Sequence, residues 1–226
     1  MANGKKTVSF QTKDGVKITG DFFDAKFLPT SLQDKKSIIL LHILPGWRGD
    51  FNELAEILWN NGYNVLNIDE RGHGESEAWP GEMGSWQEFT EKDYDRAIYD
   101  VEAAARWMQN KIPETGLALI GGSIGANLSL LYGAKAQPKV VVALSPGLNY
   151  KGIKTEIASR NFRQNLLLVA SKDDNYSFES SMRLFEISAA AKKEFIQYED
   201  AGHGTRMFLT EPELRQKILE FLSKNF

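Results

Sequence analysis

The sequence predicts an α/β protein with a doubly wound, mostly parallel sheet of about eight strands and an N-terminal antiparallel hairpin. Short apolar runs alternate with amphipathic stretches of helical length along the chain. Buried parallel strands have continuous apolar runs, and their alternation with helices indicates βαβ units. Near the N-terminus, an Asp14-Gly15 turn joins two strand-like runs and predicts the hairpin. Because no repeat or linker interrupts this pattern, a single domain over residues 1–226 is expected.

The order of the elements follows from these runs. The hairpin strands are predicted at residues 7–12 and 16–23, where β-branched and aromatic residues flank the turn. Apolar periodicity predicts the rest: strands at 37–42, 63–69, 117–121, 140–145, 166–171 and 194–199, and helices at 51–61, 91–110, 124–135, 178–191 and 211–225.

Composition narrows the class of function. The 226 residues carry a net charge of −3 and contain no cysteine, which excludes disulfides, thiolate–metal sites and a cysteine nucleophile. No basic cluster favours nucleic acid or an acidic membrane surface, so neither partner is expected. The start, MANGKKTVSF, lacks the apolar stretch of a signal peptide, and no run of 18 apolar residues occurs. A cytoplasmic location is expected, and the oligomeric state is not predicted.

The segment Gly121-Gly122-Ser123-Ile124-Gly125 is the most informative motif. It lies between a strand-like run and a helical one, and its pattern G-x-S-x-G is that of a nucleophile elbow. The turn strains the serine backbone, and a Cβ at either flanking glycine would collide with the neighbouring strand or helix. The motif is weak alone and needs a base, an acid and an oxyanion site from the rest of the chain.

Candidates for the base and the acid leave the same edge of the predicted sheet. Ser123, the pair Asp173-Asp174 and His203 each follow a strand-like run, and ligands bind at the carboxyl ends of strands in such sheets. Their order along the chain, serine, aspartate and then histidine, is that of an α/β-hydrolase triad. The imidazole would take the serine proton, and the carboxylate would fix the tautomer.

At this point the chain resembles the α/β-hydrolase superfamily over nearly its whole length. Four segments carry the resemblance, and they occur in the expected order: His42-Ile43-Leu44-Pro45-Gly46, the segment DERGHGES at residues 69–76, the GGSIG elbow, and Ala201-Gly202-His203-Gly204. The chain looks most like the dienelactone-hydrolase-like and small carboxylesterase branch. Because Ser123 stands where dienelactone hydrolases carry cysteine, the resemblance implies ester hydrolysis rather than their ring-opening reaction.

The resemblance also implies roles for single residues. Counting from the strand end, with Ser171 as the small residue, favours Asp174 as the acid, while Asp173 remains the alternative. The oxyanion hole would use the N–H of Ile124 and that of Leu44, with Ile43 as the alternative to Leu44. Ile43 replaces the glycine of the family pattern, and Pro45 has no N–H to donate.

The resemblance to α/β hydrolases also bears on the expected substrate. Lidded members insert a cap domain before the acid-bearing strand, but residues 145–165 leave room only for a loop and one short helix, so no cap is expected. The pocket would be shallow, with Trp47, Arg48 and Tyr176 as substrate-binding candidates, although such an arginine more often pairs with a neighbouring acid. Further wall candidates are Trp79, Trp86, residues 146–150 and Phe178.

The sequence therefore predicts a serine hydrolase, most simply a carboxylesterase acting on small or short-chain acyl esters through an acyl-enzyme on Ser123. The partner would be a small-molecule ester. None of the three histidines has a partner at ligand spacing, so no metal and no cofactor are expected. A thioesterase, an acyl-peptide hydrolase or a catalytically silent ligand-binding protein of the same fold remain alternatives.

Overall fold

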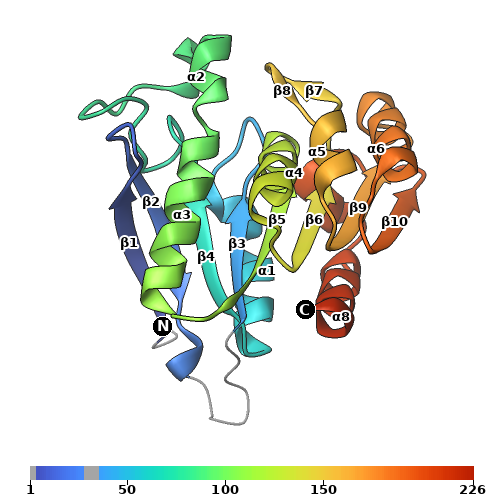
Figure 1. Cartoon of the computed structure of the whole chain (residues 1–226), viewed down its shortest axis with the longest axis horizontal. Helices are drawn as coiled ribbons and strands as arrows, with labels where there is room; N and C mark the ends of the chain where they lie inside the picture. Colours follow the sequence, from blue (N-terminus) through green and yellow to red (C-terminus); the bar gives the residue numbers. More distant parts are fainter. Residues whose placement is uncertain (1–3, 28–35) are drawn as a thin grey trace. The chain divides into compact units, whose positions relative to one another are not determined.

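The computed structural model describes residues 4–27 and 36–226, which fall into two compact units, Met1–Leu117 and Ala118–Phe226. Figure 1 labels their helices and strands. Among the described residues, no helix is both long and apolar enough to cross a membrane. The prediction of one domain over residues 1–226 is not decided by this division and stays a prediction.

The first unit is built on four strands in the spatial order β1-β2-β4-β3. The predicted hairpin is present: β1 (Lys5–Gln11) pairs antiparallel with β2 (Lys17–Phe23), and β2 pairs antiparallel with β4 (Asn64–Asp69). β3 (Lys36–Leu41) runs parallel to β4. Residues 38–41 are completely buried, as expected for a strand that is covered on both faces.

Helices pack on these strands, and a cluster of aromatic side chains joins one helix to the hairpin. The first unit contains η1 (Ala25–Phe27), η3 (Arg48–Phe51), α1 (Asn52–Asn60), η4 (Trp86–Glu88), α2 (Glu91–Asp95) and α3 (Ile98–Lys111). α1 packs on β4, while α3 packs on β1, β3 and β4. Trp107 of α3 contacts the rings of Phe10 and Phe22, with centroids 6.0 and 5.1 Å away. Trp107 therefore packs α3 against both β1 and β2.

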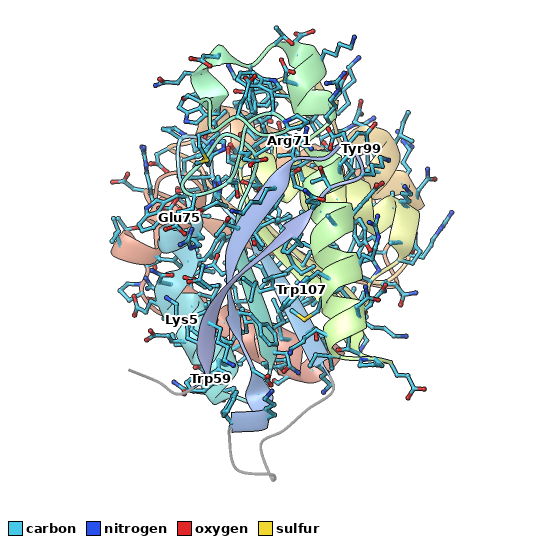
Figure 2. The ribbon with its side chains drawn as sticks, turned by 90° about the vertical axis from the view of Figure 1, so that its left-hand side faces the viewer. Lys5, Trp59, Arg71, Glu75, Tyr99 and Trp107 are labelled. Atoms are coloured by element: carbon cyan, nitrogen blue, oxygen red, sulfur yellow. The ribbon has the colours of Figure 1, made fainter. Side chains whose placement is uncertain are left out.

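The single helix predicted at residues 91–110 is wrong in one respect, because the chain forms two helices there. Arg96 and Ala97 donate their N–H groups to carbonyls three residues back, which tightens the turn and breaks the regular i→i−4 pattern. Just beyond the break, Asp100 is fully buried and binds the Arg71 guanidinium. Figure 2 shows Arg71 beside Tyr99, and its guanidinium carbon lies 5.9 Å from the Tyr99 ring centroid.

The second unit has an all-parallel arrangement in the order β5-β6-β9-β10. Its strands are β5 (Gly116–Gly122), which begins at the boundary, β6 (Val140–Leu144), β9 (Asn165–Ser171) and β10 (Lys192–Tyr198). β6 is buried at every position. With the four strands of the first unit, this gives the predicted eight strands, mostly parallel, with an antiparallel N-terminal hairpin.

The helices of the second unit are α4 (Ile124–Ala136), α5 (Glu156–Asn161), α6 (Asn175–Ile187), α7 (Met207–Thr210) and α8 (Leu214–Asn225), with the short turn η5 (Gly204–Arg206). α4 packs on β6, α6 packs on β9, and α5 lies between α4 and α6, as Figure 1 shows. α6 starts and ends before the predicted limits 178–191: Asp174 is its N-cap residue, and Ser188 turns the chain into an extended conformation.

The segment between β6 and β9 contains no cap domain. All of its residues are described, and they form a small hairpin, β7 (Asn149–Tyr150) with β8 (Ile153–Lys154), followed by α5. The expectation of one short helix there is confirmed, whereas the hairpin was not predicted.

The close contact at Gly121 gives a stability prediction. A Cβ at this position would lie 2.2 Å from the Gly125 carbonyl oxygen, a backbone atom that cannot move independently. Gly121→Ala should therefore lower the free energy of unfolding by about 3 kcal/mol or more, as overpacking does at its upper end. In Gly133→Ala the nearest atom is a Val141 methyl at 3.1 Å, and the change should stay within about 1 kcal/mol. Urea unfolding measures both, and equal effects would contradict this account.

Candidate active site

Ser123 occupies a strained turn between β5 and α4. Its φ of 53° and ψ of −117° lie outside the regions that L residues usually adopt. Such a conformation costs about 1–3 kcal/mol and persists only where the surroundings impose it. Here the surroundings do so: the Ser123 N–H donates to the Leu144 carbonyl at 2.8 Å, and the missing Cβ of Gly121 lets Gly125 approach β5 closely. The side chain thus stands at the carboxyl end of β5, as the motif predicts.

Asp174 and His203 are brought together at the carboxyl ends of β9 and β10. The distance between Asp174 Oδ2 and His203 Nδ1 is 2.6 Å. Burial alone would raise the pKa of the Asp174 carboxyl, but hydrogen bonds from His203 and Ser177 outweigh it and hold that pKa below its ordinary value. The carboxylate therefore stays charged and accepts the Nδ1 proton, which leaves Nε2 as the basic nitrogen of the neutral imidazole.

Asp173 makes different contacts. Its carboxylate accepts the N–H of Gly202 at 3.1 and 3.2 Å and the hydroxyl of Ser171, and Ser171 Oγ in turn accepts the N–H of Ala201 at 2.7 Å. The hydrogen bond from Ser171 is the main reason why the pKa of Asp173 is lowered. Asp173 thus fastens the loop that precedes His203, while Asp174 contacts the imidazole itself.

Three further hydroxyl groups surround the pair, and sequence reasoning missed their roles. Ser145 Oγ accepts the N–H of Gly204 at 2.9 Å. Ser177 Oγ lies 3.3 Å from His203 Nδ1 and 2.7 Å from the hydroxyl of Tyr150. Tyr150 fell within the predicted pocket wall, but not as a hydrogen-bonding group. A usable signal was present, since Ser145 and Ser171 stand at the ends of strand-like runs on the edge that carries the triad candidates.

Ser123 belongs to the same unit as the Asp174–His203 pair. Among the described residues, the Ser123 and His203 side chains are not hydrogen-bonded to each other, although catalytic hydrogen bonds often tighten only when substrate binds. The structure therefore joins two of the three predicted triad residues, Asp174 and His203, directly.

The two predicted oxyanion donors lie in different units. Ile124 is the first residue of α4, where the backbone N–H groups of a helix have no partner within the helix and carry partial positive charge. Leu44 follows β3 in the first unit and is partly exposed, directly before Pro45. The pairing of Leu44 with Ile124, and the alternative use of Ile43, stay predictions.

Arg48 is engaged by acids, which is the alternative that the sequence left open. The side chain is buried, and its guanidinium binds Asp21 at 3.3 Å, Glu75 at 2.7 Å and also Asp69. These contacts favour a structural role for Arg48 over the predicted contact with substrate. Its neighbour Trp47 is 50% exposed and remains a candidate for substrate contact.

Tyr176, the third predicted substrate-binding residue, lies in the first turn of α6 and is half-exposed. Its hydroxyl accepts the N–H of Asn149 at 2.9 Å and donates to the carbonyl of the same residue at 3.0 Å. Tyr176 therefore fixes the β7–β8 hairpin beside the triad candidates, and its ring remains open to solvent.

The first unit holds a buried cluster of His42, Glu70 and His73. His42 Nδ1 donates to the Ile43 carbonyl at 2.7 Å, and its Nε2 lies 2.9 Å from Glu70 Oε2. Burial alone would lower the pKa of His42, but the charge of Glu70 reverses this and raises it, while burial raises the pKa of Glu70. His42 is thus held by hydrogen bonds at both ring nitrogens, to the Ile43 carbonyl and from the Glu70 N–H.

His73 differs from His42. Its ring stacks on Trp86 with 5.7 Å between centroids, and its Nδ1 donates to the Arg71 carbonyl at 2.9 Å. Burial and the nearby His42 lower its pKa to about 3. Nε2 is buried without a hydrogen-bond partner among the described residues. His73 is therefore neutral in the folded protein at neutral pH.

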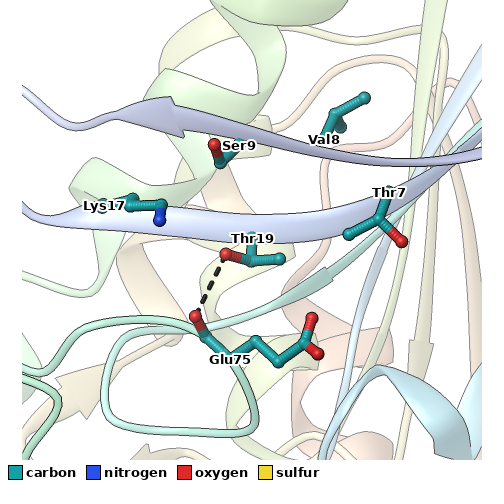
Figure 3. A pocket seen from close by; sticks show the side chains of 6 residues that line it. All are labelled: Thr7, Val8, Ser9, Lys17, Thr19 and Glu75. Carbon is teal, nitrogen blue, oxygen red and sulfur yellow. Dashed lines mark hydrogen bonds between the residues drawn. The ribbon is translucent and has the colours of Figure 1, made fainter.

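The first unit also carries an open polar pocket of about 300 Å³, shown in Figure 3. Thr19 donates its hydroxyl proton to the Glu75 carbonyl at 3.0 Å on one wall. The pocket contains no predicted triad or oxyanion residue. Its lining residues are Thr7, Val8, Ser9, Lys17, Thr19 and Glu75. Within the described part of the chain, no group of three or more metal-ligating side chains occurs.

A serine on a strand–turn–helix elbow, with an aspartate–histidine pair following in chain order, is the arrangement of α/β hydrolases. A family model described as serine aminopeptidase, S33, matches residues 33–164, which is more than half of the chain. The chain belongs to this family.

Solved structures with the same fold are esterases and related hydrolases. An esterase from Pyrococcus furiosus, Pf2001, is similar over 97% of this chain and 91% of its own, with a TM-score of 0.80 and 22% identity. A dienelactone hydrolase from Anabaena variabilis is similar over 99% of this chain and 98% of its own, with a TM-score of 0.72 and 16% identity. These likenesses show the α/β-hydrolase fold and confirm the predicted resemblance.

A curated relative, the lysophosphatidylserine lipase ABHD12 of Macaca fascicularis, is 24% identical over 89% of this chain. The chain spans 60% of that relative's length. Together, the family model and the solved structures show that the chain is a member of this family with the α/β-hydrolase fold.

The buried, neutral His73 gives a pH prediction. A pKa lowered from 6.5 to about 3 in the folded state adds stability that is present above pH 6.5 and is lost as the pH falls towards 3. The loss should reach about 1.4 kcal/mol per pH unit for one proton. Other groups titrate in the same range, so the test compares urea unfolding of the wild type with that of His73→Asn. The difference between them should shrink with falling pH, and parallel curves would contradict this assignment.

Proposed function

We propose that the protein is a serine carboxylesterase that cleaves small or short-chain acyl esters through an acyl-enzyme on Ser123. The observation that carries this proposal is the 2.6 Å contact between Asp174 and His203 in the unit that holds the strained Ser123 elbow. An aspartate–imidazole pair of this kind makes a general base of the other ring nitrogen.

The proposed reaction uses each residue in turn. His203 Nε2 takes the Ser123 hydroxyl proton while Ser123 Oγ attacks the ester carbonyl, and Asp174 stabilises the imidazolium that forms. The N–H groups of Ile124 and Leu44 would hold the oxyanion. His203 then gives its proton to the leaving alcohol. Water, activated by the same imidazole, finally releases the acid and regenerates Ser123.

The absence of a cap in the described segment 145–165 supports a preference for short acyl chains. Each methylene removed from water contributes about 0.8 kcal/mol to binding, so an open site gains little from a long chain. We place the optimum at about two to six acyl carbons on this burial argument. Trp47 and Tyr176, which are both half-exposed, are the proposed substrate contacts.

Hydrolysis of an acylated amine is a second candidate function, and the serine aminopeptidase description of the family model favours it. The same nucleophile, base and oxyanion donors would serve it, as they would a thioester. Rates on matched ester, thioester, N-acyl-peptide and peptide substrates with a free amino terminus separate these activities.

Removing the nucleophile tests the proposal. Ser123→Ala should lower kcat on p-nitrophenyl esters by a factor on the order of 10⁶, as loss of a triad serine does elsewhere. Ser159→Ala is the matched control, since Ser159 is also buried and its hydroxyl donates to the Leu184 carbonyl at 2.9 Å. Ester chains of increasing length locate the optimum. A Ser123→Ala variant that kept a tenth of the activity would refute the proposal.

The two adjacent aspartates should respond differently. Asp174→Asn should lower kcat by about 10⁴, because an amide cannot hold His203 in the required tautomer. Asp173→Asn keeps an oxygen that can accept the Gly202 N–H, so its kcat should change little. Steady-state kinetics of both variants decide the matter, and the reverse ranking would make Asp173 the acid.

A further inference from the structure

A chain of hydroxyl groups runs from the β7–β8 hairpin to the Asp174–His203 pair. Tyr150, the last residue of β7, places its hydroxyl 2.7 Å from Ser177 Oγ in the first turn of α6. Ser177 Oγ is in turn 3.3 Å from His203 Nδ1. Ser177 is completely buried, so its hydroxyl exchanges hydrogen bonds with these groups rather than with bulk solvent.

The number of available protons fixes the direction of these hydrogen bonds. His203 Nδ1 carries one proton, and its main hydrogen-bond acceptor is Asp174 Oδ2, at 2.6 Å. The Ser177 side chain also helps to keep the pKa of the Asp174 carboxyl low, which is the effect of a hydroxyl proton directed at the carboxylate. With the Ser177 proton directed at the carboxylate, a Ser177 lone pair is left to accept the proton of Tyr150. On this count of protons Tyr150 donates to Ser177, and Ser177 donates to Asp174.

Tyr150 is suited to act as a donor. Burial raises the pKa of its phenol to about 12, so the hydroxyl keeps its proton throughout the neutral range. Its other acceptor, the Ser145 carbonyl, is 3.4 Å away and therefore weaker than Ser177. The ring is held in place by an edge-on contact with Tyr176, with centroids 5.6 Å apart. At Gly147 even a Cβ would come within 2.7 Å of it.

We propose that Tyr150 and Ser177 are positioning residues, in which Tyr150 acts through Ser177 to align the Asp174 carboxylate with the Nδ1 proton of His203. Their effect on turnover rests on the proposed function, whereas their effect on Asp174 does not depend on any reaction. Neither hydroxyl is required to touch the substrate. The role follows from hydrogen bonds to a charged acceptor, which are stronger than those between neutral groups.

The kinetic part of the test separates alignment from substrate binding. Ser177→Ala should lower kcat by about 10-fold to 100-fold, the loss that slight misplacement of catalytic groups produces, and KM should change little. Tyr150→Phe should have a smaller effect in the same direction, since Ser177 keeps its own bond to the carboxylate. Because Tyr150 acts through Ser177, the double variant should match Ser177→Ala rather than show the product of both losses.

The spectroscopic part reads Asp174 directly. A carbon-detected NMR titration of the Asp174 carboxyl should give a pKa that rises towards its ordinary value in Ser177→Ala and rises less in Tyr150→Phe. Tyr198→Phe and Ser159→Ala are matched controls within the second unit. They remove hydroxyls that bind Lys217 at 3.0 Å and the Leu184 carbonyl at 2.9 Å, and they should leave the Asp174 titration unchanged.

The outcomes distinguish this inference from the proposed function. If no ester, thioester or acyl-peptide is cleaved, the proposed function fails, and the titration still decides whether Tyr150 and Ser177 act on Asp174. If the protein is active but Ser177→Ala leaves both kcat and the Asp174 titration unchanged, the inference is overturned. Independent effects of the two substitutions would overturn the claim that Tyr150 acts through Ser177.

Discussion

The backbone conformation of Ser123 is the constraint on which the rest of the second unit depends. A φ of 53° with a ψ of −117° is unfavourable for serine, and it persists only because several neighbours impose it. β5 delivers the chain to the turn, the Leu144 carbonyl binds the Ser123 N–H, and α4 begins at the next residue. The turn leaves no room for a side chain at Gly121. The arrangement fixes the position of one hydroxyl relative to the ends of β6, β9 and β10.

The other half of the site lies on loops, and hydrogen bonds give those loops the rigidity that regular structure gives to Ser123. The chain around His203 is held on both sides: Asp173 and Ser171 bind the backbone before it, and Ser145 binds the N–H of Gly204 after it. Asp174, at the start of α6, is then close enough to hold the imidazole. These contacts explain why two adjacent aspartates have different roles, since one organises the loop and the other faces the ring.

The fold could be predicted from the sequence because it follows from local patterns. Continuous apolar runs such as residues 140–144 correspond to strands buried on both faces, and the Asp14-Gly15 turn marks the hairpin. The nucleophile candidate was predictable for the same reason, since the elbow is a short motif. The break between α2 and α3 was not, because it depends on backbone hydrogen bonds over three residues rather than on any helix-breaking residue.

The positions of Ser145 and Ser171 at strand ends are visible in the sequence, but the hydrogen-bond partners of the supporting hydroxyls could not be predicted because these partners are distant in the sequence. Ser145 meets Gly204 across 59 positions, and Tyr150 meets Ser177 across 27. Arg48 was predicted as a substrate contact because it lies beside the predicted oxyanion loop. Its acidic partners are Asp21 of β2, Asp69 at the end of β4 and Glu75 in the turn that follows. Sequence patterns identify reactive residues, but only the folded structure shows which neighbouring groups bind their side chains.

Covalent labelling of Ser123 is the most direct test of the account. A fluorophosphonate reacts with a serine only when a neighbouring base activates it, so the wild type should yield one adduct, located on the peptide that contains Ser123 by mass spectrometry. Labelling should disappear in Ser123→Ala and become much slower in Asp174→Asn. A wild-type protein that forms no adduct, or forms one on another residue, would contradict the claim that Ser123 is an activated nucleophile.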